Sequence, residues 1–199
     1  MTRTDAYETA VGLAVETLRD VDLDQCCPAL GLPLPQQGKM DFRAFGRDLT
    51  LTFPDFQLYF AGNQEPVKVS DRILVLHYLL CPIPVRFMDR VISFRELAGG
   101  QFYWSAFQSR SVKPLEQRFG DRLEQLKVNL SRFDWEPVSI GDLGARIHVM
   151  GNVYVTLIYR LGDEEFPPAA DFLFDASIKH IYKAEDAAVL ASRICLSLL

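Results

Sequence analysis

The feature that most constrains the fold is the apolar run ILVLHYLL at residues 73–80. Ser70 precedes it as a good helix N-cap, so the sequence predicts a helix over residues 71–80. Pro82 and Pro84 end this helix, because proline has no amide hydrogen to donate to a helical hydrogen bond. A helix that is apolar on nearly every face has to be buried on most sides. We therefore expect it at the centre of the structure.

One histidine, His77, lies in the middle of this apolar run. It is either a core histidine whose ring nitrogens are hydrogen-bonded or a ligand to a metal or metallated cofactor. The second interpretation rests on the neutral imidazole being the commonest metal ligand in proteins. Both interpretations stay open at the level of sequence.

The next segment has a strand-like pattern, a glycine break and then a cluster of aromatic residues. Residues 90–97 (RVISFREL) alternate well enough for a strand, and the glycines at 99–100 permit positive φ. Residues 101–110 follow, and in a helix Tyr103 and Phe107, four apart, give one aromatic side. A stripe of this kind is either part of the core or the wall of a cofactor site.

Four arginines accompany these aromatic residues, at positions 86, 90, 95 and 110. Guanidinium groups beside aromatic rings suit a flat anionic ligand, because the rings stack on it and the guanidinium pairs with carboxylate or phosphate. The segment is therefore the first candidate for a ligand site.

The rest of the chain predicts an α+β fold with a mainly antiparallel sheet built from hairpins. A buried central helix and N- and C-terminal helices would pack on it, in a single domain over residues 1–199. The predicted strands are residues 39–45, 48–53, 56–60, 145–150, 153–159 and 171–174, with turns at 46–47 and 151–152, and the predicted helices after the centre are 115–119, 122–132 and 185–198.

Composition excludes several classes of protein. The net charge is −5 and the pI is about 5.2, which gives no electrostatic support for binding nucleic acid. The longest apolar run has eight residues, too few to span a membrane. Charges throughout the first twenty residues argue against a secretory signal, so a cytoplasmic location with reduced thiols is expected. The four cysteines include no CxxC pair, which excludes the usual zinc and iron–sulfur frameworks.

An acidic turn, GDEEFP at residues 162–167, suggests a second type of site. Glu165, with Asp175 and His180 further along, is a candidate ligand set for a divalent metal or an acid–base group. The alternative is that these carboxylates are solvated or structural. The motifs GxGxxG, GxxxxGK[ST], GxSxG and HExxH are all absent, so the enzyme classes that they define lose their support.

Several motifs together resemble one family. LHYLL, SFREL-x-GG-x-FYW-x-AF, GDEEFP and LFDAS occur in the expected order from about residue 39 to the C-terminus. They are similar to the bacterial and archaeal domain-of-unknown-function family 3786. The resemblance implies a setting in anaerobic metabolism, near corrinoid or haem proteins, because some members carry an iron–sulfur segment like that of corrinoid proteins. This chain has no such cysteine cluster.

These observations lead to a functional expectation with two alternatives. We expect a ligand-binding or accessory module for a tetrapyrrole-like (corrinoid or haem) or other flat anionic cofactor. The first alternative is a small metal-assisted hydrolase or transferase using the acidic turn, and the second is an assembly factor that binds a partner protein. In the cofactor hypothesis, the axial ligand is His77 or His180, the stacking wall is Tyr103 and Trp104, and the carboxylate partners are Arg95 and Arg110.

Overall fold

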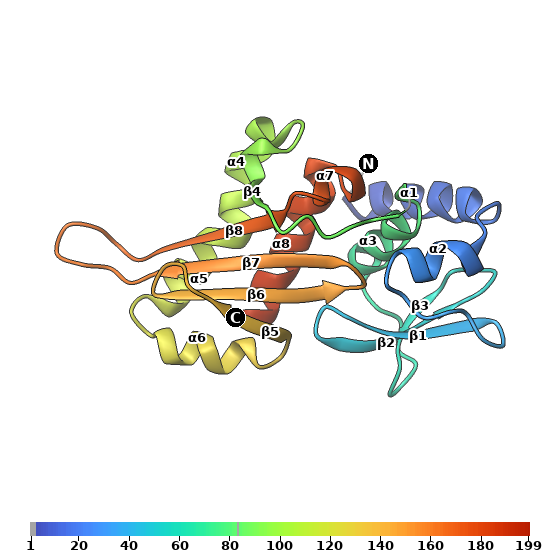
Figure 1. Ribbon diagram of the computed structural model, residues 1–199, viewed down its shortest axis with the longest axis horizontal. Coiled ribbons are helices and arrows are strands. Elements are labelled where there is room, and N and C mark those ends of the chain that lie inside the picture. The colour runs from blue at the N-terminus through green and yellow to red at the C-terminus, as the bar shows by residue number, and fades with distance from the viewer. Residues whose placement is uncertain (1–2, 83) are drawn as a thin grey trace. The chain divides into compact units, whose positions relative to one another are not determined.

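The chain has the predicted α+β fold, with two antiparallel sheets (Figure 1). The computed structural model describes residues 3–82 and 84–199. The chain divides into two compact units, which are described separately below, and the expected single domain stays a prediction. Unit 1 comprises Met1–Arg86, Met150–Asn152 and His180–Tyr182, and unit 2 comprises Phe87–Val149, Val153–Lys179 and Lys183–Leu199.

Among the described residues, unit 1 contains helices α1 to α3, the three-stranded sheet with the order β1-β2-β3, and the two short segments 150–152 and 180–182. Both strand pairs are antiparallel. The elements are α1 (Arg3–Leu18), α2 (Leu23–Ala29), β1 (Lys39–Ala44), β2 (Arg47–Thr52), β3 (Leu58–Phe60) and α3 (Val69–Leu79).

The hairpin of β1 and β2 follows directly from its alternating sequence. Every second residue of the two strands faces the core and is buried, namely Met40, Phe42, Ala44, Leu49 and Leu51. The residues between them face outward. The turn lies one residue earlier than predicted, because Ala44 pairs with Arg47 and the two loop residues are Phe45 and Gly46. Both have positive φ, 54° and 73°, as a two-residue type I′ turn requires.

Helix α3 occupies the predicted central place in unit 1. Ile73, Leu74, Val75 and Leu76 are all 2% exposed or less, so the apolar run is covered on most of its faces. The predicted cap was wrong, because the helix begins at Val69, before Ser70, and its N-cap residue makes no side-chain hydrogen bond. The Ser70 hydroxyl instead lies 3.5 Å from the Asp71 carboxylate.

A buried tyrosine, Tyr78, joins α3 to two other segments of unit 1. Its hydroxyl donates to the carbonyl of Leu30 at 2.5 Å and accepts from the amide of Asn152 at 2.8 Å. Gly151 belongs to the same turn, with a φ of 48°, and a Cβ there would lie only 2.3 Å from the Leu30 oxygen. Glycine is therefore required at 151 by both conformation and space.

Unit 2 contains the five-stranded sheet, whose order is β4-β8-β7-β6-β5. A 3₁₀ helix and a π-helical segment flank α4, and the short α7 (Ile178–Ile181) has residues of both units. The other elements are β4 (Val91–Ser93), the 3₁₀ helix Phe94–Glu96, α4 (Gly100–Phe107), the π-helical segment Gln108–Val112, α5 (Lys113–Phe119), α6 (Leu123–Leu130), β5 (Asp134–Val138), β6 (Leu143–Met150), β7 (Val153–Arg160), β8 (Ala169–Asp175) and α8 (Ala184–Leu198).

The core of unit 2 lies between one face of this sheet and the helices α5 and α8, which run behind the strands in Figure 1. Val155 pairs with Phe174 and Leu157 with Phe172, and all four side chains are fully buried. Strand β5 was not predicted. It contains Pro137, which cannot donate to a ladder, and it forms the edge of the sheet, where proline is tolerated.

None of the helices among the described residues is long and apolar enough to cross a membrane.

The central position of α3 makes a quantitative prediction. Leu76 is 0% exposed, so Leu76→Ala should lower the free energy of unfolding by roughly 2–5 kcal/mol through the cavity it leaves. The same change at Leu13, a helical leucine that is 61% exposed, should cost about 1 kcal/mol or less. Chemical denaturation of the two variants measures the difference, and equal midpoints would contradict the placement of α3.

A second prediction concerns the buried hydroxyl of Tyr78. Tyr78→Phe removes both of its hydrogen bonds while preserving the ring, so unfolding should become easier by about 1–3 kcal/mol. Tyr103→Phe removes a hydroxyl from a side chain that is 43% exposed and serves as the control. Thermal melts of both variants provide the measurement. An unchanged melting temperature for Tyr78→Phe would show that these two bonds add nothing to stability.

Candidate functional site

The predicted site in unit 2 begins where β4 ends. The chain leaves the strand at Ser93 because Ser93 and Glu96 form a capping box, in which Glu96 accepts from the Ser93 amide at 2.7 Å. That hydrogen bond is the main reason why the pKa of Glu96 is lowered. The prediction of a strand through residue 97 was therefore wrong. Instead Phe94 is fully buried and Arg95 is exposed.

The two glycines bring α4 directly against this 3₁₀ helix. Gly99 has a φ of 81°, and a Cβ on Gly100 would lie 2.1 Å from the Phe94 oxygen. Only glycine permits this close approach. As a result, the first residues of α4 lie beside Phe94 and Arg95.

The aromatic residues of α4 divide between core and surface. Phe107 stacks on Phe94 with ring centroids 4.1 Å apart, and Trp104 stacks on Phe107 at 5.4 Å. Tyr103 and Phe102 are instead 43% and 93% exposed. The predicted aromatic side formed by Tyr103 and Phe107 was therefore wrong, because the helix faces the core through Trp104 and Phe107, three residues apart.

Arg95 lies over the ring of Trp104, with its guanidinium carbon 4.2 Å from the ring centroid. This is the geometry of a cation–π contact. Within the described residues, Arg95 has no carboxylate at ion-pair distance. Asp171 is near enough for Arg95 to lower its pKa slightly, although burial is the larger effect and raises that pKa overall. Arg95 thus carries a positive charge that rests on an aromatic ring and has no ion-pair partner in the part of the chain that the structure describes.

The remaining candidate residues for cofactor binding lie elsewhere. Arg110 is exposed in the π-helical segment after α4. His77 and His180 belong to unit 1, where His77 is half-buried in α3 and His180 is exposed at α7. Within unit 2, the structure therefore brings Arg95 and Trp104 together. An axial role for either histidine stays a prediction.

The two candidate metal ligands have separate roles. Glu165 is exposed in a loop organised by Asp163, whose carboxylate accepts from the amides of Glu165 and Phe166 at 2.9 and 2.7 Å. These bonds lower the pKa of Asp163. Asp175 is buried at the other end of β8, where it accepts from the amides of Met88 and Ser177. Among residues 3–82 and 84–199, no group of three or more histidines, cysteines or acidic residues is arranged to hold a metal.

The cysteines do not offer a nucleophile to an enzyme hypothesis. All four are buried, and burial raises the pKa of Cys27, Cys81 and Cys195 to about 12. Thiols with such pKa values stay protonated at neutral pH, and the thiolate is the reactive form.

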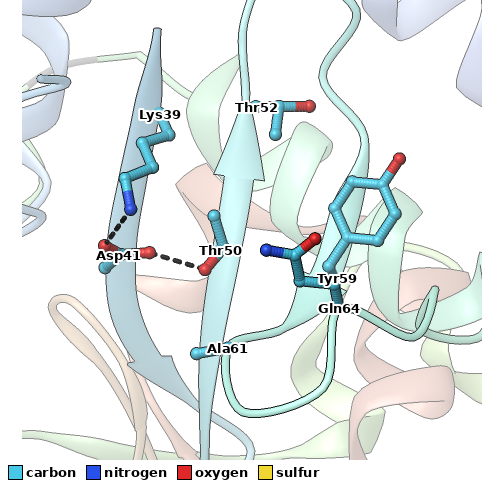
Figure 2. A pocket seen from close by; sticks show the side chains of 7 residues that line it. All are labelled: Lys39, Asp41, Thr50, Thr52, Tyr59, Ala61 and Gln64. Carbon is cyan, nitrogen blue, oxygen red and sulfur yellow. Dashed lines mark hydrogen bonds and ion pairs between the residues drawn. The ribbon is translucent and has the colours of Figure 1, made fainter. Parts of the chain in front are cut away.

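A pocket in unit 1 was missed by the sequence analysis. It has a volume of about 450 Å³ and lies on the outer face of the three-stranded sheet (Figure 2). Its lining comes from alternate residues of three strands and from the loop after β3, namely Lys39, Asp41, Thr50, Thr52, Tyr59, Ala61 and Gln64.

Hydrogen bonds connect the side chains on one side of this pocket. Lys39 pairs with Asp41 at 3.3 Å, and the Thr50 hydroxyl donates to the same carboxylate at 2.5 Å. The Thr50 bond is the main reason why the pKa of Asp41 is lowered. Figure 2 shows Tyr59 and Gln64 on the other side of the pocket, with the carboxamide of Gln64 directed toward Thr50.

The sequence did contain a sign of this pocket. In KMDFRA and RDLTLT every second residue is polar, so the face opposite the core had to gather Lys39, Asp41, Thr50 and Thr52. The loop at residues 61–64 borders that face on one side. Its path depends on backbone turns that no sequence pattern indicated.

Comparisons with known proteins identify the family but no activity. Comparison with curated proteins and with solved structures gave no match. The family Domain of unknown function (DUF3786) matches residues 22–197, which runs from α2 to the last turn of α8 and begins earlier than the predicted residue 39. Because this match covers most of the 199 residues, the chain belongs to the DUF3786 family.

Proposed function

We propose that this protein is a cytoplasmic accessory module that binds a flat anionic ligand at the surface formed by Arg95 and Trp104. The observation that carries the proposal is the guanidinium of Arg95 lying 4.2 Å above the Trp104 ring without an ion-pair partner in the described part of the chain. A cation held against an aromatic ring in this way suits an anionic ligand.

The chemistry of this surface favours a ligand that is both planar and acidic. The indole covers one side of the guanidinium and holds it in place, so less side-chain entropy is lost when a ligand binds. The other side and the N–H edge remain for a flat ring and for a carboxylate or phosphate, which arginine binds with two parallel hydrogen bonds. Tyr103 and Phe102 add exposed aromatic surface on the same helix.

A tetrapyrrole such as haem or a corrinoid is the ligand class that we put first. Haem offers a planar macrocycle with two carboxylates, and cobalamin offers a macrocycle with a phosphodiester, so each has an anion that this surface would recognise. The axial role of His77 or His180 stays a prediction from the sequence, because both histidines belong to unit 1, and it needs its own variant. The metal-assisted alternative ranks lower, because Glu165 and Asp175 lie at opposite ends of β8.

Titration with haem and with cobalamin tests the proposal. The parent protein should bind one of them with a dissociation constant of about 10 µM or tighter, and Arg95→Ala should weaken binding at least about tenfold through loss of the ionic contact. Arg95→Lys should restore only part of the affinity, because lysine lacks the planar fork. Difference absorbance spectroscopy gives the constants, and circular dichroism confirms that each variant is folded.

Two further variants make the result specific. Arg118→Ala removes an exposed arginine of α5 and should leave the affinity unchanged within a factor of about two. His77→Ala should remove the spectral change of axial ligation if His77 is the ligand. Equal, weak binding by the parent, Arg95→Ala and Arg118→Ala proteins would overturn the proposed function.

A further inference from the structure

We infer that the pocket on the outer face of the unit 1 sheet is a binding site for a small neutral polyhydroxylated ligand, either a free monosaccharide or the ribose of a nucleoside. The inference does not depend on the proposed function, because it concerns other residues, in the other unit. Its basis is the set of polar groups that line the pocket shown in Figure 2.

The first argument is the charge of the lining. Among the described lining residues, only Lys39 and Asp41 carry formal charges, and they pair with each other at 3.3 Å. The pocket therefore has no net charge to offer an anion or a cation. An ionic ligand therefore gains less Coulomb energy here than beside an unpaired charge, whereas the binding of a neutral ligand does not depend on such a gain.

The second argument is the density of hydrogen-bonding groups. A carboxylate, an ammonium, two threonine hydroxyls, a phenol and a carboxamide surround about 450 Å³. The two oxygens of the Asp41 carboxylate have about four lone pairs that can accept hydrogen bonds. One lone pair accepts from Thr50 and one faces the ammonium of Lys39. The remaining lone pairs can accept from two neighbouring hydroxyls, which is the pattern that a vicinal diol presents.

The third argument is that polar groups on the opposite side of the pocket are available for hydrogen bonds with a ligand. Among the described residues, neither the Tyr59 hydroxyl nor the Gln64 carboxamide has a hydrogen-bond partner in the protein. Gln64 offers both donors and an acceptor, and Tyr59 adds an aromatic ring beside its hydroxyl. A ligand with many hydroxyl groups satisfies these groups and those of Asp41 at once.

The backbone holds this side of the pocket in place. The amide of Gln64 donates to the carbonyl of Phe60 at 2.9 Å, and the amide of Ala61 donates to the carbonyl of Asp48 at 3.0 Å. The Asn63 side chain accepts from the amide of Glu65 at 3.1 Å. Gln64 is thereby fixed at a φ of 54°, so its side chain is presented over the sheet before any ligand arrives.

The size of the pocket limits the ligand. Ligand pockets usually have volumes of about 300–1,000 Å³, so 450 Å³ lies toward the small end of that range. One sugar ring is therefore the expected occupant.

The test is a titration of the intact ¹⁵N-labelled protein with D-glucose, D-ribose and adenosine, followed by amide chemical shifts. At least one probe should shift the amides of Asp41, Thr50 and Gln64 with a dissociation constant of about 1 mM or tighter. Tighter binding of glucose than of the other probes assigns a free sugar. Tighter binding of adenosine than of ribose assigns a nucleoside, and the reverse order with ribose above glucose assigns a free pentose.

Matched variants connect the shifts with the pocket. Asp41→Asn should weaken binding at least about tenfold through loss of charge-assisted hydrogen bonds, and Gln64→Ala, at an exposed position, should weaken it without unfolding the protein. Asp48→Asn is the control, because Asp48 is also exposed on β2 and paired with Arg43 but does not line the pocket. No shift at these amides with any probe at about 10 mM, or equal affinity in Asp41→Asn and Asp48→Asn, would overturn the inference.

Discussion

The need to cover α3 on all sides determines how unit 1 is assembled. A helix whose faces are nearly all apolar cannot lie against one sheet only, because the remaining faces would stay in water. Helix α1 packs on it, and two short segments from far along the sequence contribute as well. The Tyr182 hydroxyl donates to the carbonyl of Leu74 at 2.8 Å, and the Asn152 amide donates to the Tyr78 hydroxyl. Unit 1 therefore includes residues 150–152 and 180–182, which closes its core with pieces of later elements.

Elements that depend on local patterns could be predicted from the sequence, whereas the contributions of residues 150–152 and 180–182 to unit 1 could not. Local patterns gave α3, the hairpin of β1 and β2 and the turn at Gly151 and Asn152, because each follows from periodicity or from a turn preference. Errors arose where a single side chain competes with the pattern. At Ser93 the capping box with Glu96 ended a strand that alternation alone would continue, and nothing in the sequence marks residues 180–182 as part of the first unit.

The same division holds for the candidate sites. Arg95 and Trp104 were both named from composition, and their contact depends on the glycines at 99–100, which let α4 approach the residue before Arg95. Tyr103 was misplaced, since the buried face of α4 is the one that meets Phe94 and Phe174, and Phe174 comes from β8, far along the chain. The pocket of unit 1 was missed because alternating polar residues also fit an ordinary solvent-exposed sheet face. The loop at residues 61–64 is what makes this face concave.

The Arg95 surface and the pocket of unit 1 differ in charge, so the binding of ligands to them should respond differently to salt. Arg95 has no ion-pair partner among the described residues, so an anionic ligand there gains Coulomb energy that salt screens. Raising the salt from 0.1 to 1 M shortens the Debye length from about 10 to about 3 Å. It should weaken the binding of haem, through its carboxylates, or of cobalamin, through its phosphodiester, severalfold. The charges of Lys39 and Asp41 already compensate each other, and the hydrogen bond from Thr50 holds the carboxylate in place.

A neutral sugar in the unit 1 pocket should therefore bind with nearly the same affinity at both salt concentrations. The measurement is the pair of titrations described above, repeated at 0.1 and 1 M sodium chloride. A severalfold loss of sugar affinity at high salt would mean that the Lys39–Asp41 pair does not neutralise the pocket. Salt-independent binding at the Arg95 surface would mean that aromatic contact, and not the guanidinium, holds the ligand.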